Sequence, residues 1–266
     1  MKSPTVVYSI WNLTLGLGIL VWQGKSFAEA SAAVRSEILF TFAIALFHFI
    51  YSIWFWKGKE NPNFLQSGLF VRAIALPVYI LDFFLFYNTR NYQDLSLDFR
   101  TFFLIYLLLY VSVEILHIVS VFFQKLKINS PDWKSFTASG FEYKNRFAFA
   151  IYMSLMGVWI LSYSQGFLEF FRLPATLFPG FDANGMLFRP IHLIGIHFLM
   201  LAYYNLIAVF YQIEPLIEAG MRGGSFTCVF LLALVMLGIL SPMVLLIPLV
   251  DLVSVGFLLG KKLIKS

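Results

Sequence analysis

The stretch from residue 101 to residue 123, TFFLIYLLLYVSVEILHIVSVFF, decides the kind of fold that this chain adopts. It is long enough to cross a bilayer as a helix, because a spanning helix needs about 20 mostly apolar residues. Two ionisable side chains, Glu114 and His117, lie inside it, and Arg100 and Lys125 flank it. We therefore interpret it as a transmembrane helix that carries buried polar groups.

The composition of the whole chain agrees with this interpretation. Of 266 residues, 60% are hydrophobic and only 12% are charged, and the mean hydropathy is +0.80. A soluble domain carries about 25% charged residues, so the composition excludes a water-soluble globule. The single cysteine, Cys228, excludes a disulfide framework and a thiolate metal cluster.

Hydropathy predicts about eight transmembrane helices, and hence an all-α, polytopic integral membrane protein. The predicted spans are residues 6–22, 38–56, 68–87, 101–123, 147–163, 191–211, 225–240 and 243–260. Ser241 and Pro242 separate the last two spans as a turn signal, and one long kinked helix is the competing interpretation. We favour two helices, because about 36 unbroken residues would overshoot the ~30 Å hydrocarbon core.

The basic residues predict the orientation. Twelve of the 19 lysines and arginines flank the spans on the side of both termini, six lie on the other side, and Arg72 lies within a span. By the positive-inside rule, both termini are expected in the cytoplasm, with the protein in the cytoplasmic (inner) membrane. The net charge of +5 is then a topology signal, and no nucleic-acid partner is needed to explain it.

The chain also resembles itself. Residues 35–55 and 189–210 both open with an arginine and continue as aromatic-rich helices of similar length. Residues 110–127 and 247–264 align with Glu114 opposite Asp251. We predict two parallel four-helix repeats, related by a pseudo-twofold axis along the membrane normal. The repeats cover residues 1–127 and 140–266, and a basic linker, residues 128–139, joins them.

Acidic residues inside the spans are the first candidates for a functional site, because a charge in the bilayer core needs a partner, water or a proton. Glu114 and His117 share one helix face, and Arg72 enters from the same side at a depth within its reach. One interpretation is a structural ion pair between Arg72 and Glu114, with His117 bonded beside it. The other is a cluster that binds a ligand or protons, with Asp251 as its counterpart in the second repeat.

Three further residues complete the candidates. His48 lies at a depth similar to that of His117, and the two could hold a b-type haem as axial ligands. We nevertheless predict no cofactor and no metal, since polar histidines inside a bundle commonly bond across helices. His197 is a candidate cavity residue of the second half, and Asp82 lies near the outer end of a span that Pro77 kinks. The long outer loop, residues 164–190, is predicted to form a short interfacial or re-entrant helix.

A four-helix unit with an arginine opening its second helix and an acid in its fourth resembles the small DoxX-like bacterial membrane proteins, present here as a tandem pair. The resemblance implies a four-helix bundle in each half and assigns no catalytic residue. We expect a protein that binds or transports a small or lipophilic compound through a polar intramembrane cavity, in one version with proton coupling. The alternatives are a membrane enzyme acting on a lipid or quinone, with Glu114 and His117 as acid and base, and a non-catalytic assembly partner. The oligomeric state stays open.

Overall fold

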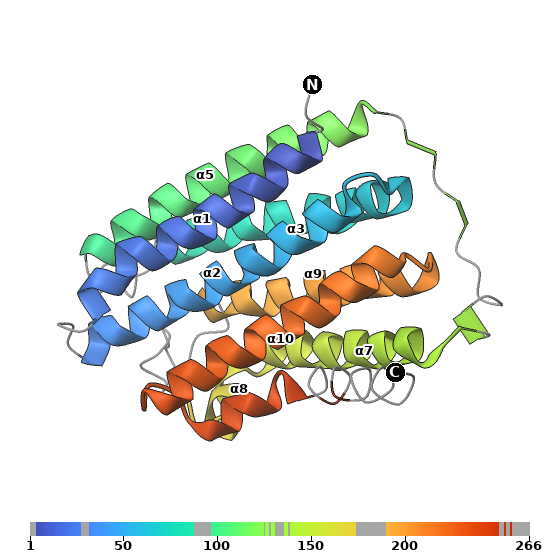
Figure 1. Cartoon of the computed structure of the whole chain (residues 1–266). Helices are drawn as coiled ribbons and strands as arrows, with labels where there is room; N and C mark the ends of the chain where they lie inside the picture. Colours follow the sequence, from blue (N-terminus) through green and yellow to red (C-terminus); the bar gives the residue numbers. More distant parts are fainter. Residues whose placement is uncertain are drawn as a thin grey trace.

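The fold is given by a computed structural model, shown in Figure 1. It describes residues 4–27, 32–87, 97–124, 139–173 and 190–249, with isolated positions at 126–127, 129–130, 136–137, 253 and 256. Within these residues the chain is helical and contains no strand. The helices are α1 (Pro4–Phe27), α2 (Ala32–Gly58), α3 (Pro62–Tyr87), α5 (Leu97–Phe122), α7 (Phe141–Ser162), α8 (Ser164–Phe170), α9 (Pro190–Phe210) and α10 (Glu214–Met236), followed by the short 3-10 helix η2 (Pro242–Leu246).

Six helices, α1, α3, α5, α7, α9 and α10, are long and apolar enough to cross a membrane. Large apolar side chains such as Leu17, Leu116 and Leu155 are exposed on the outside of the bundle, whereas His48, Arg72 and Glu114 are buried inside it. This distribution suits a protein surrounded by lipid. The protein is therefore an all-α, multi-pass membrane protein. Helix α2 forms where a span is predicted, but it is not among the six.

Two predicted boundaries are wrong. Helix α10 begins at Glu214, eleven residues before the predicted start at 225, because Pro215 and the acidic Glu214 start the helix and the glycines that follow do not interrupt it. The predicted helix from residue 243 begins instead as the 3-10 helix η2, whose first turn Ser241 caps by accepting a hydrogen bond from the Met243 N–H. Beyond residue 249 the predicted eighth span lies almost wholly outside the described residues.

One glycine explains why α10 does not continue as a long kinked helix. Gly238 has a φ of 69°, the left-handed conformation that commonly ends helices. The N–H of Ile239 then bonds back to the Leu234 carbonyl at 2.9 Å, which closes the last turn. The described chain thus breaks after α10, and the second helix of the two-helix interpretation lies almost wholly outside the described residues.

The helices run alongside one another as antiparallel neighbours (Figure 1). Helix α1 packs along α2, and α7 packs along α9. Helix α3 lies against α9, α10 lies against α2, and α5 covers α1 and α3. The N-terminal end of α1 and the segment that joins α5 to α7 lie at the same end of the bundle, which we call the linker end.

Small residues allow α7 and α9 to approach closely. A Cβ atom at Gly157 would lie 2.9 Å from the Gly195 carbonyl oxygen, and one at Gly195 would lie 3.2 Å from the Gly157 carbonyl oxygen. Close backbone approach at small residues is a common way for membrane helices to pack. In the other pair, a Cβ at Gly16 of α1 would lie 3.2 Å from the Ala45 carbonyl oxygen of α2.

Candidate functional site

The predicted contact between Arg72 and Glu114 is present in the first half of the chain. The Arg72 Nη1 atom lies 3.4 Å from Glu114 Oε2 and 2.5 Å from the His117 Nδ1 atom. Arg72 and Glu114 are 1% and 2% exposed, so the pair is fully buried. Tyr8 of α1 donates its hydroxyl hydrogen to the second carboxylate oxygen of Glu114. The carboxylate therefore has a partner for each oxygen.

Aromatic rings enclose this ion pair. The Tyr8 ring stacks on the His117 ring at 4.1 Å, and the Arg72 guanidinium lies 5.0 Å from the centre of the Phe55 ring. His117 Nε2 lies 3.4 Å from the Thr5 hydroxyl, at the linker end of α1. These contacts connect α1, α2, α3 and α5 through one group of side chains, which we call the arginine cluster.

The depth of the cluster differs slightly from expectation. Helix α3 begins at Pro62 rather than at residue 68, so Arg72 lies ten residues into its helix, and Glu114 lies eight residues from the end of α5. At 1.5 Å per residue the depth difference is about 3 Å, half of what the predicted helix ends imply. Direct contact between Arg72 and Glu114 therefore needs only a modest reach of the arginine side chain.

The arginine cluster leaves no room for a ligand. The crevice beside it, between Tyr79, Tyr110 and Glu114, is too narrow to hold a water molecule. Arg72 Nη2 is buried there without a hydrogen bond within the described structure. Within this part of the bundle the polar groups bond to one another rather than line a cavity.

A second buried polar group centres on two histidines. His48 bonds through Nδ1 to Asn12 Oδ1 at 2.8 Å and through Nε2 to the Tyr106 hydroxyl at 3.0 Å. His197 of α9 bonds to Tyr51 of α2 at 2.8 Å and to Tyr79 of α3 at 3.0 Å. The histidine ring that lies beside His48 is that of His197, at 6.4 Å between ring centres, and the Tyr106 and Tyr110 rings are closer, at 5.6 Å. We call these residues the histidine–tyrosine layer, and through it α9 is bonded to the first half.

The two histidines considered as haem ligands both bond to protein side chains. Both ring nitrogens of His48 already have protein partners, and His117 is engaged by Arg72 and Thr5. Among the described residues no group of three or more histidine, cysteine, aspartate or glutamate side chains is placed to hold a metal ion.

Two predicted site residues cannot be placed. Asp251 and the side chain of Asp82 lie outside the described residues, and so does Arg189, which opens the second repeat in the alignment. The short helix predicted in the outer loop is present as α8, whose Phe167 and Leu168 are buried in the bundle. The loop beyond residue 173 is outside the described residues until α9.

Sequence reasoning missed the tyrosines, although a signal was available. On α5, Tyr106 and Tyr110 precede Glu114 and His117 at helical spacing, so the four share one face. That polar face could have been recognised on a helix otherwise rich in leucine and valine.

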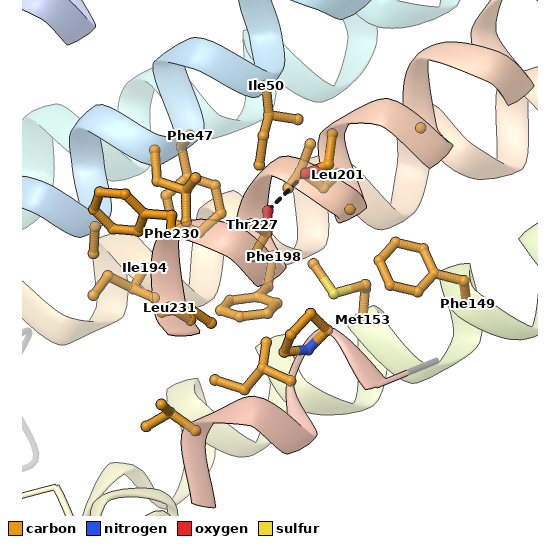
Figure 2. Close-up of a pocket in the computed structure, with 18 of the residues that line it drawn as sticks. Phe47, Ile50, Phe149, Met153, Ile194, Phe198, Leu201, Thr227, Phe230 and Leu231 are labelled. Carbon is orange, nitrogen blue, oxygen red and sulfur yellow. Dashed lines mark hydrogen bonds between the residues drawn. The ribbon is translucent and has the colours of Figure 1, made fainter. Parts of the chain in front are cut away.

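A cavity that the sequence did not reveal lies between the second half and helix α2 of the first half (Figure 2). Its volume is about 160 Å³, and its walls come from α2, α7, α8, α9, α10 and η2. The lining is largely apolar, with Phe47 and Ile50 from α2, Met153 from α7, Phe198 from α9 and Phe230 from α10. Figure 2 shows these side chains pointing into a common space between the helices.

The polar groups of the cavity are few. Arg146 of α7, Asn205 of α9 and Thr227 of α10 line it, and Arg146 and Asn205 are 1% and 2% exposed. Arg146 precedes the predicted span at residues 147–163, but α7 begins at Phe141 and carries it into the bundle. The Thr227 hydroxyl is bonded to the Gly223 carbonyl of its own helix at 2.9 Å.

Comparison of the chain with protein-family models, with curated proteins and with solved structures returns no match. The function is therefore argued from the cavity, the arginine cluster and the histidine–tyrosine layer.

Proposed function

We propose that this protein resides in the cytoplasmic membrane and binds a lipophilic compound in the cavity between α2, α7, α9 and α10. The main support for this proposal is the cavity itself, which is apolar along most of its wall and about 160 Å³ in volume. Interiors of proteins are close-packed, so a space with room for on the order of ten water-sized groups is unusual. Apolar walls with a few polar groups are typical of small-molecule sites.

The arginine cluster has a different role in this proposal. Its carboxylate, guanidinium and imidazole bond to one another, and the crevice beside them is too narrow for a ligand. It holds α1, α3 and α5 together, and the histidine–tyrosine layer holds α9 against them. The lipophilic ligand that the sequence suggested around Glu114 is thus assigned to the second half instead.

We further propose that the two halves are copies of one four-helix unit. In support, the close pair α1 and α2 has a counterpart in α7 and α9, and the contact of α3 with α9 has a counterpart in that of α10 with α2. Gly16 of α1 and Gly157 of α7 each lie where their helix meets its close partner. In the first copy the interior is filled by Tyr8, Arg72 and Glu114, and in the second it is hollow.

Filling the cavity tests the proposal. A Cβ at Gly223 would lie 3.5 Å from Ile50, an ordinary contact, and the larger side chain of Gly223→Leu would occupy the cavity. We expect the variant to fold at least as well as the parent, since leucine favours a helix over glycine by about 1 kcal/mol. We expect it to lose the ligand-induced rise in thermal stability, which reaches about 2.7 kcal/mol at a hundred times the dissociation constant. The measurement is thermal unfolding of the purified protein with a panel of lipids, quinones and haem.

Val229→Leu is the matched control, because Val229 is on the exposed face of the same helix. It should retain the full response to every active compound. A Gly223→Leu protein that responds as strongly as the parent would show that the ligand binds elsewhere.

The orientation is proposed with both termini in the cytoplasm. At the linker end, Lys57 of α2 is 3.6 Å from Glu218 of α10, and Lys59, Lys127 and Lys144 belong to segments at the same end. We expect fusions of green fluorescent protein to either terminus to fluoresce and fusions of alkaline phosphatase to be inactive. Active phosphatase at either terminus would refute this orientation.

A further inference from the structure

The cavity has two chemically different ends. At one end lie Arg146, Asn205 and Gly220, and at the other lie apolar residues of α8, α9 and η2, among them Phe167, Ile194 and Val244. We propose that the cavity takes a lipid with a single aliphatic chain, whose head carries a negative charge and a hydroxyl group, as in a lysophospholipid. This proposal rests on the function proposed above and specifies the ligand class.

Arg146 supplies the positive charge for the head. It lies five residues into α7, about 8 Å from the helix start, and is 1% exposed. Its guanidinium lies 5.1 Å from the Phe149 ring centre, and a Cβ at Gly220 of α10 would lie 3.0 Å from its Cζ. The glycine leaves space for the guanidinium at the cavity wall. Guanidinium groups bind phosphate and carboxylate through strong, charge-assisted hydrogen bonds.

Asn205 supplies a hydrogen-bond acceptor. Its Nδ2 donates to the Leu201 carbonyl at 2.7 Å, whereas its Oδ1 makes no hydrogen bond within the described structure. Asn205 is 2% exposed and lines the cavity, so this oxygen is an unsatisfied buried acceptor. Such atoms are rare because they are costly to bury, and a ligand hydroxyl would satisfy this one.

Arg146 and Asn205 lie at similar depth. Gly157 of α7 contacts Gly195 and Leu199 of α9, which fixes the antiparallel register of the two helices. Counting residues along both helices from that contact places Asn205 at the depth of Phe149. Along α7, Phe149 lies about one helical turn, or ~5 Å, from Arg146. One head group that joins an anion to a neighbouring hydroxyl can therefore reach both side chains.

The rest of the cavity suits one aliphatic chain. On α10 the lining runs from Gly220 through Gly223, Thr227 and Phe230 to Leu234, one face of the helix. The fourteen steps from Gly220 to Leu234 extend about 21 Å at 1.5 Å per residue, more than one leaflet of a ~30 Å hydrocarbon core. A cavity that is this long with a volume of about 160 Å³ is narrow, so it holds one chain better than two.

The experiment compares three oleoyl probes on the full-length protein in a nonionic detergent, with affinities from native mass spectrometry. Oleoyl lysophosphatidylglycerol offers charge and hydroxyl, oleate offers charge alone, and monoolein offers hydroxyls alone. We expect lysophosphatidylglycerol to bind about tenfold or more tighter than monoolein. Arg146→Gln should remove this preference. Asn205→Leu should lower the affinity for lysophosphatidylglycerol several-fold and leave the affinity for oleate unchanged.

The outcomes separate the two proposals. Equal binding of monoolein and lysophosphatidylglycerol, blocked by Gly223→Leu, would overturn the anionic head and leave the lipophilic site intact. An Asn205→Leu protein that binds both charged probes like the parent would overturn the hydroxyl contact, and this variant keeps the test decisive if Arg146→Gln does not fold. If Gly223→Leu does not reduce the binding of any of the three probes, the proposed ligand class is refuted. Binding of another compound of the panel that Gly223→Leu abolishes would then still establish the cavity as a binding site.

Discussion

Replacing Glu114 by glutamine should strongly destabilise the protein. The substitution leaves the Arg72 guanidinium, 1% exposed, without its counter-charge in the middle of the bundle. Removing one partner of a buried ion pair costs about 3–5 kcal/mol, because the remaining charge stays buried. We expect a loss of this size in the free energy of unfolding, measured by denaturing-detergent titration in mixed micelles.

The double variant Arg72→Met/Glu114→Gln provides the first control. It removes both charges, so it should be more stable than Glu114→Gln alone, as replaced buried ion pairs often are. Glu218→Gln provides the second, since the Glu218 pair with Arg222 is on the surface and should contribute little. A Glu114→Gln protein as stable as the parent would show that the carboxylate is not required to hold the helices, and the cluster would again be a candidate for proton or ligand binding.

The arginine cluster was largely predictable, because its main contacts follow from rules that act along one helix. Glu114 and His117 are three residues apart on α5, and a buried charge at that depth needs a partner, which Arg72 provides. Tyr8 could not be assigned, since its role depends on how α1 packs against α5. His48 shows the same limit: its depth suggested His117 as a neighbour, whereas the packing of α2 against α9 brings His197 beside it.

The cavity could not be predicted, because part of its space is left by glycines, and this space exists only once the helices have packed. Residues 220–225, GMRGGS, have low helix propensity and precede or begin the predicted span at 225–240. In the structure the same glycines lie inside α10, where Gly220 makes room for Arg146 and Gly223 opens the wall. Arg146 itself looked like a loop residue beside Lys144, and only the start of α7 at Phe141 shows that it is buried.

Substituting Gly157 should separate α7 from α9. An added Cβ would lie 2.9 Å from the Gly195 carbonyl oxygen and 2.8 Å from Leu199 Cγ. A backbone oxygen cannot rotate away as a side chain can, so the two helices must move apart. We expect Gly157→Ala to lower the free energy of unfolding by about 1–3 kcal/mol and Gly157→Leu to lower it further, because atoms added at a close contact displace the backbone.

Gly18 of α1 provides a control for which no loss of stability is expected. A Cβ there meets nothing within 4 Å, so Gly18→Ala should leave stability unchanged or raise it by up to about 1 kcal/mol through helix propensity. The register argued for Arg146 and Asn205 depends on the Gly157 contact, so Gly157→Ala should also weaken ligand binding, whereas Gly18→Ala should not. If Gly157→Ala and Gly18→Ala have the same effect on the detergent midpoint and on ligand affinity, the close approach of α7 to α9 does not shape the cavity.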